Sequence, residues 1–163
     1  MNRKARRLTH AAIIGALYVV LTHLQNLIFP NSASMAIQFR ASEALCVLAF
    51  FTPAAIPGLT VGCLLFNLTF IGSLPLDFLV GTLATLGATA SMRLLRRLPF
   101  LGLLMPALWN AFLVGWELSV YIGGGFWLNA LYVAIGEAAV LLTLGTALYY
   151  ALKTRNLHTR LFS

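Results

Sequence analysis

The sequence ALCVLAFFTPAAIPGLTVGCLLF, residues 44–66, decides how many times this chain can cross a membrane. It carries no charge and is long enough to span a bilayer as one helix, which needs roughly 20 apolar residues. Pro53 and Pro57 interrupt it, and a proline inside a helix removes a hydrogen bond and clashes with the preceding turn. The pair therefore predicts a tight apolar turn between two short helices, over 41–52 and 58–71.

The distribution of charge also favours two short helices over one fused span. Basic residues gather at both ends of the chain and at 93–97, and lysine and arginine mark the cytoplasmic loops of membrane proteins. If all three clusters lie inside, an even number of spans must precede 93–97, and a single span over 44–66 would put that cluster outside. The turn itself has no lysine or arginine, so its backbone must be buried in protein or lie near the membrane surface.

Composition indicates a polytopic membrane protein. Of the 163 residues, 60% are hydrophobic and 9% charged, whereas about a quarter of a soluble domain is charged. The basic residues behind the net charge of +7 flank apolar runs, which does not suggest a nucleic-acid partner. We therefore predict an all-α fold, a six-transmembrane-helix bundle that forms a single membrane domain over 1–163, with both termini cytoplasmic. The helices are expected over 8–29, 41–52, 58–71, 76–92, 100–122 and 127–152.

The four acidic residues lie inside or beside apolar runs, far from the basic clusters. With both termini inside, Glu43 and Asp77 fall at the outer ends of their helices, Glu117 in an outer third, and Glu137 deeper. Arg40 precedes Glu43 by three positions and shares a helix face with it. Charged groups at membrane depth are expensive and tend to mark ligand or ion paths. The outer half of the bundle is therefore a candidate binding site.

Amides and tryptophans are expected at the same level. Asn110 and Glu117 share one stripe of the helix over 100–122, flanked by Trp109 and Trp116, and Asn67 lies in the outer part of 58–71. Carboxylates accept from N–H groups, amides read ligand edges, and aromatic rings stack on flat faces, which suits a flat cationic ligand. The predicted substrate-binding residues are Arg40, Glu43, Asn67, Asp77, Trp109, Asn110, Trp116, Glu117 and Glu137.

Structural roles remain open for several of these residues. Asp77 follows a proline by two positions and could cap the next helix. Arg40 and Glu43 could form a structural ion pair. Tyr121 and Trp127 could belong to an aromatic belt at the membrane surface.

Small residues form a second pattern in the inner half of 8–29. Ala11 and Gly15, like Ala12 and Ala16, are four positions apart, a spacing that lets helix backbones approach closely in lipid. This stripe lies away from the polar residues and so suits a partner protein. Ordinary packing within the chain is the alternative.

Motifs for chemistry on the solute are absent from the sequence. It contains no Walker A loop, no H-E-x-x-H and no G-x-S-x-G. Cys46 and Cys63 lie in apolar helices without C-x-x-C spacing, so we interpret them as packing residues, and the histidines show no metal spacing. We predict a binding protein, not an enzyme, with no metal or cofactor of its own.

The stretch IQFRASEAL at 37–45, followed by FFTP at 50–53 and PGLTVGCLLFN at 57–67, resembles the QueT family of queuosine-precursor transporters. F-R-x-S-E is the specific part of the likeness, which extends to the length, the six spans, the basic N-terminus and the alanine-rich first helix. The resemblance implies the substrate-specificity subunit (S component) of an energy-coupling-factor (ECF) ABC importer in the bacterial plasma membrane. Its implied partners are a transmembrane coupling subunit and two ATPase subunits that hydrolyse the ATP.

The resemblance also implies roles for residues. The ligand would be 7-aminomethyl-7-deazaguanine or queuine, captured at the outer face. Glu117 or Glu137 would accept from its ring N–H groups, and Glu43, steered by Arg40, would meet the amine or order the loop after the first helix. Loops 31–38, 72–75 and 123–126 would close over it, and the bundle would tip to release it inside. The positions that match the family's coupling-subunit motif are Ala11, Ala12, Gly15 and Ala16.

Three alternatives stay open. The same fold could serve another vitamin or nucleobase. A small intramembrane enzyme could use Glu117 and Glu137 as acid and base. An assembly subunit could pair its buried acids only with Arg40 and helix termini.

Overall fold

The computed structural model describes residues 2–30 and 39–154, and all the secondary structure of these residues is helical. The predicted all-α class is confirmed, with six helical segments in chain order. The segments are α1 (Arg3–Ile28), the 3₁₀ turn η1 (Ala41–Val47) running into α2 (Leu48–Phe51), α3 (Ala55–Thr69), α4 (Asp77–Leu94), α5 (Pro99–Tyr121), and α6 (Phe126–Val140) continued by the π turn η2 (Leu141–Gly145) and α7 (Thr146–Thr154). The expected loop over 31–38 lies outside the described residues.

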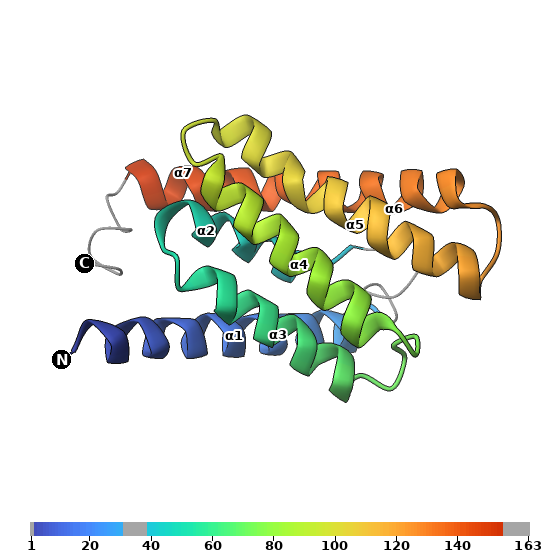
Figure 1. The fold of residues 1–163 in the computed structure, drawn as a ribbon, viewed down its shortest axis with the longest axis horizontal. Helices are drawn as coiled ribbons and strands as arrows, with labels where there is room; N and C mark the ends of the chain where they lie inside the picture. The colour runs from blue at the N-terminus through green and yellow to red at the C-terminus, as the bar shows by residue number, and fades with distance from the viewer. Residues whose placement is uncertain (1, 31–38, 155–163) are drawn as a thin grey trace.

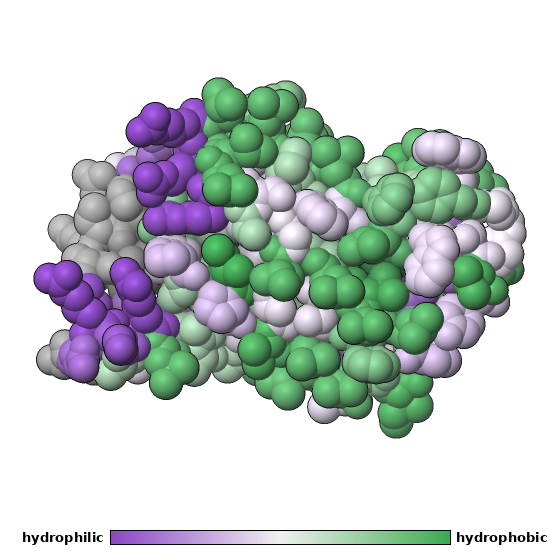
Figure 2. All heavy atoms as spheres, viewed as in Figure 1, coloured by the Kyte–Doolittle hydropathy of each residue, from purple (hydrophilic) through white to green (hydrophobic). Residues whose placement is uncertain are grey.

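The helices run roughly along one long axis, so that their connections gather at two ends (Figure 1). The start of α1, the end of α7, the α2–α3 turn and the α4–α5 turn lie at one end. The α3–α4 and α5–α6 connections lie at the other end. Figure 2 shows hydrophilic residues massed at the end with the termini, while hydrophobic residues cover most of the remaining face. This separation matches the basic clusters predicted for one side of a membrane; which side that is stays a prediction.

Three helices are long and apolar enough to cross a membrane: Arg3–Ile28, Pro99–Tyr121 and Phe126–Thr154. The helices Ala41–Phe51 and Ala55–Thr69 are apolar but shorter. Large apolar side chains lie exposed along the bundle, among them Leu27, Phe112 and Ile135. In lipid these side chains need no further cover, and together the features make this a membrane protein.

The stretch 44–66 breaks where its prolines predict, but the turn is shorter than expected. α2 ends at Phe51 and α3 begins at Ala55, so Pro57 lies in the first turn of α3. A proline is tolerated there because its missing N–H would have no partner in the helix. The Thr52 hydroxyl oxygen accepts from the Ala54 N–H at 3.3 Å and closes the turn.

Glycines bring α1 and α3 into backbone contact. A Cβ added to Gly15 would lie 2.8 Å from the Gly58 carbonyl oxygen, and one added to Gly58 would lie 2.6 Å from the Ala11 carbonyl oxygen. Gly62 meets Gly15 and Tyr18 in the same way. The contact holds α1 and α3 as one unit beside the rest of the bundle.

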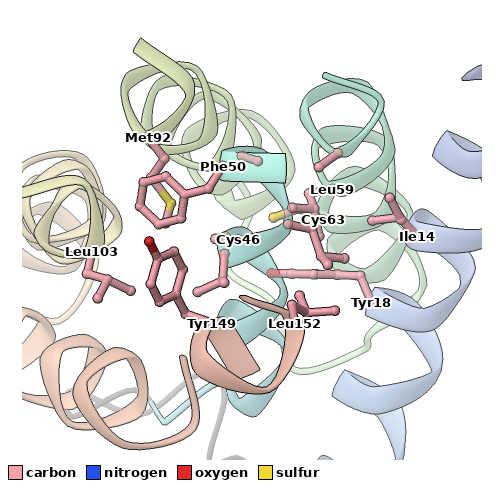
Figure 3. Packing of buried hydrophobic residues seen from close by; sticks show 14 of the residues in the cluster. Ile14, Tyr18, Cys46, Phe50, Leu59, Cys63, Met92, Leu103, Tyr149 and Leu152 are labelled. Carbon is pink, nitrogen blue, oxygen red and sulfur yellow. The ribbon is translucent and has the colours of Figure 1, made fainter. Parts of the chain in front are cut away.

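The apolar core surrounds η1 and α2 (Figure 3). Cys46 lies between Tyr149 of α7 and side chains of α3 such as Leu59, and Phe50 packs edge to face on the Tyr149 ring beside Met92. Cys46 and Cys63 are both buried free thiols, in agreement with their predicted packing role. The core therefore fixes the short 3₁₀ segment that carries Glu43.

Candidate functional site

All four acidic residues of the chain are buried, and they surround Arg40, which is the one buried arginine among residues 2–30 and 39–154. Arg40 interacts electrostatically with Asp77 and Glu43. Glu117 interacts with Asp77 and Arg40, and Glu137 interacts with Glu43 and Arg40. We call these five residues the Arg40 centre. It unites, from four different helical segments, every acid that the sequence placed in the candidate site.

Two residues of the Arg40 centre lie at the start of a helix. Arg40 immediately precedes η1, and Glu43 lies in the first turn of η1. Asp77 begins α4, and its Oδ2 accepts from the Leu74 N–H at 2.6 Å. Asp77 therefore stabilises the turn before α4 and does not cap the helix, the role left open from the sequence, because the N-cap residue is Leu76 and no side chain caps it. Its backbone carbonyl accepts from Asn67 Nδ2 at 2.8 Å, which places Asn67 beside the centre.

Several polar side-chain atoms in the bundle interior are buried with no hydrogen-bond partner among the described residues, and four of them belong to Glu117, Glu137 and Asn67 at the Arg40 centre. They include Oε2 of Glu137, Oδ1 of Asn67, Nδ2 of Asn110 and both carboxyl oxygens of Glu117, whose nearest polar neighbour is the Asp77 carboxyl rather than an N–H donor. A buried polar group left without a partner costs about 1–3 kcal/mol, so such groups are rare in folded proteins. All but the Asn110 amide are acceptors, so the region is suited to a ligand rich in N–H donors.

Glu43 differs from Glu117 because protein donors occupy its oxygens. The Tyr18 hydroxyl donates to Oε1 at 2.6 Å, and the Cys46 thiol donates to Oε2 at 3.1 Å. Tyr18 was not among the predicted residues. The available signal was a hydroxyl-bearing ring in the middle of an apolar helix, since a buried tyrosine hydroxyl usually finds a partner.

Sequence reasoning also left Asn129 out. It is buried near the start of α6 and donates from Nδ2 to the Gly123 carbonyl at 2.7 Å. Gly123, Gly124 and Gly125 all have positive φ angles, between 82° and 87°, which glycine adopts without strain. Asn129 therefore helps to fix the irregular α5–α6 connection.

The two predicted tryptophans lie elsewhere. Trp109 and Trp116 are 38% and 48% exposed, so they face out of the bundle rather than into the Arg40 centre. Each precedes a buried polar residue by one position, and one residue turns the helix by about 100°. The Trp109 ring lies on Gly87, and its Nε1 donates to Ser91 Oγ at 3.1 Å. The aromatic ring beside Arg40 is that of Phe66, whose centroid lies 5.8 Å from the guanidinium carbon.

The small-residue stripe of α1 is divided between two surroundings. Gly15 is buried against α3, whereas Ala12 and Ala16 are exposed. Ala11 is half-buried. All four line an apolar groove between α1 and α3. Gly15, on the buried edge of the stripe, packs within the chain, whereas Ala12 and Ala16, on the exposed edge, leave room for a partner protein.

Comparison with known families decides the relationship. A family model described as QueT transporter matches residues 8–154. This chain belongs to the QueT transporter family. The matched range includes every residue of the Arg40 centre, and the family is one of transporters, not of enzymes. The resemblance of the F-R-x-S-E region to QueT is therefore confirmed.

A curated relative agrees with this assignment. This QueT family chain is 42% identical over 76 residues to a protein of Lactococcus lactis subsp. cremoris (strain MG1363) named queuosine precursor transporter QueT. The match covers 46% of the present chain and 42% of the relative. The chain thus matches less than half the length of this relative. No solved structure matches the chain.

Proposed function

We propose that this QueT family chain binds a queuosine precursor at the Arg40 centre, as the substrate-specificity subunit of an ECF-type importer. The observation that carries the proposal is the set of buried acceptors without partners on Glu117 and Glu137. Family membership and the name of the relative support a precursor such as 7-aminomethyl-7-deazaguanine or queuine.

The pattern of unpartnered oxygens suggests which acid meets which part of the ligand. The guanine-like edge presents a ring N–H beside an exocyclic amine, two donors that match the two carboxyl oxygens of Glu117. The charged amine of the side chain needs an acceptor of its own, and Oε2 of Glu137 supplies one. Arg40 can donate to the ring carbonyl oxygen, which an ionised carboxylate cannot do.

Charge supports a cationic ligand. The centre holds four acids and one base, and charges buried without partners are strongly unfavourable in a membrane interior. A ligand that carries a protonated amine reduces the excess of negative charge. Guanine has no such amine and should therefore bind less tightly.

Energy for uptake would come from partners. The chain would capture solute at the outer face of the bacterial plasma membrane and dock on a transmembrane coupling subunit driven by two ATPases. It would bind no ATP itself. Ala12 and Ala16, exposed on α1, are the residues of the small stripe that remain accessible to such a subunit.

Calorimetry on the purified chain in detergent tests the proposal. We expect 7-aminomethyl-7-deazaguanine to bind, queuine to compete with it, and guanine to compete more weakly. Glu117→Gln replaces one acceptor by a donor and should weaken binding by about 100-fold or more. The control is Trp116→Phe, on the next residue of α5 but exposed, which should leave affinity unchanged. Absence of binding by all three compounds contradicts the proposed substrate class.

A further inference from the structure

Three side chains of α1 attach that helix to the segment that carries Arg40. Tyr18 donates to Glu43, and Thr22 Oγ1 lies 2.7 Å from Ser42 Oγ in a shared hydrogen bond. Gln25 donates to the Phe39 carbonyl, and its Oε1 accepts from the Ala41 N–H at 2.6 Å. The three α1 residues are four and three positions apart, so they form one stripe of the helix. We call Tyr18, Thr22 and Gln25 the α1 ladder.

The segment needs such support because regular secondary structure does not supply it. Phe39 and Arg40 precede η1, and the residues up to Val47 form a 3₁₀ helix, whose hydrogen-bond geometry is poorer than that of an α-helix. Glu43, Ser42 and Arg40 are nevertheless all buried. Bonds from the ladder to both ends and the middle of 39–43 hold this short segment in one register.

The ladder starts from the most firmly packed part of α1. Gly15 is in backbone contact with Gly58 and Gly62, and a Cβ on Gly62 would lie 3.0 Å from the Tyr18 Cβ. Tyr18 is fully buried, and Figure 3 shows it pointing from α1 towards Cys46 and Cys63. Its hydroxyl therefore reaches Glu43 from a fixed base.

We propose that the α1 ladder, and Tyr18 above all, positions Glu43 and Arg40, and that Glu43 acts on the ligand only through Arg40. Each Glu43 oxygen already accepts a hydrogen bond from the protein, from Tyr18 or Cys46, and Glu43 also interacts with the Arg40 guanidinium. Glu43 thus orients the one cation of the centre and leaves ligand N–H groups to Glu117 and Glu137. The ligand-binding part of this inference rests on the proposed function; the positioning part does not.

Hydrogen exchange of the ligand-free chain tests the positioning alone. Tyr18→Phe removes one hydroxyl and keeps the ring, so we expect amide exchange of residues 39–47 to rise about tenfold while that of α4 and α5 stays unchanged. Tyr150→Phe makes the same change at an exposed tyrosine of α7 and should have no such effect. Unchanged exchange over 39–47 overturns the proposal. If Tyr18→Phe does not fold, Thr22→Val removes the next bond of the ladder and is measured in the same way.

Calorimetry then tests whether Glu43 acts through Arg40. We expect Tyr18→Phe and Glu43→Gln each to weaken binding of 7-aminomethyl-7-deazaguanine by about tenfold, and the double variant to bind no more weakly than the weaker single variant. The preference over 7-methyl-7-deazaguanine, which lacks the amine, should persist in all three. If Glu43→Gln abolishes that preference, Glu43 touches the amine and the inference fails. If the wild type binds neither compound, the proposed function fails, while the exchange experiment still decides the positioning.

Discussion

At the scale of single residues, the binding role proposed for the Arg40 centre predicts that its acids lower the stability of the ligand-free fold. Both carboxyl oxygens of Glu117 are buried beside the Asp77 carboxyl and accept no hydrogen bond of regular geometry from the described residues. A buried polar group left in this state costs the ligand-free fold about 1–3 kcal/mol. Glu117→Met has a similar length and no polar atoms. We expect it to raise the melting temperature of the ligand-free chain by a few °C and to remove the stabilisation that ligand gives the wild type. A lower melting temperature without ligand would show that the carboxyl is paired within the fold.

Gly81 is a second residue whose size matters to the centre. A Cβ there would lie 2.8 Å from Asn67 Nδ2 and 3.9 Å from Arg40 Nη1, so Gly81→Ala should push Asn67 off the Asp77 carbonyl. Overpacking of this kind costs about 1–3 kcal/mol, and we expect a lower melting temperature together with weaker ligand binding. Gly145→Ala is the matched control, because its Cβ would meet its nearest neighbour at an ordinary 3.5 Å. Equal effects of the two changes would contradict the special position of Gly81.

Individual residues also show which parts of the candidate site can be predicted from the sequence alone. Buried acids in an apolar chain stand out, so Glu43, Asp77, Glu117 and Glu137 were predicted together and are found together. Trp109 and Trp116 were attached to the site by their spacing, but a shift of one position turns a side chain to another helix face. Tyr18 was missed because its role depends on a residue 25 positions away, and such a contact leaves no local pattern.

At the scale of elements, the two edges of the α1 stripe should behave in opposite ways. Gly15 lies against the backbone of α3, so Gly15→Leu should separate the helices and prevent folding. Ala16 is exposed, so Ala16→Leu should leave the melting temperature unchanged yet prevent co-purification with the coupling subunit proposed as its partner. Thermal melts and affinity capture with that subunit check both changes. A chain with Ala16→Leu that still captures the subunit places the docking surface elsewhere.

Helix identities were more predictable than their internal irregularities. Pro53 and Pro57 predict the break of the helix within 44–66, because a proline constrains its own backbone. No local sequence pattern predicts that Ala41–Val47 forms a 3₁₀ helix or that Leu141–Gly145 forms a π turn. Gly145 packs against Val47 of η1 and Leu103 of α5. The irregular turns therefore depend on tertiary contacts between η1, α5 and the last helical segment. Such contacts can only be read from the assembled bundle.

At the scale of the whole molecule, the distribution of basic residues agrees with the order in which the helices are connected. The start of α1, the α4–α5 turn and the end of α7, which carry the basic residues at 3–7, 93–97 and 153, lie at one end of the long axis, and the α3–α4 and α5–α6 connections lie at the other. An even number of helical segments precedes the α4–α5 turn, as the charge argument required. The positive-inside rule predicts that the basic end faces the cytoplasm and that the α5–α6 connection faces outward.

Cysteine labelling of intact cells tests this orientation. Ile122→Cys places an accessible thiol beside the α5–α6 connection, and Arg97→Cys places one at the basic end; both positions are exposed. The native Cys46 and Cys63 have no exposed surface and should give little background. A maleimide that cannot cross membranes should label Ile122→Cys from outside and Arg97→Cys only after lysis. The reverse labelling pattern would show the opposite orientation of the bundle in the membrane. The end with the α3–α4 and α5–α6 connections would then face the cytoplasm, and the chain could not capture a solute from outside there.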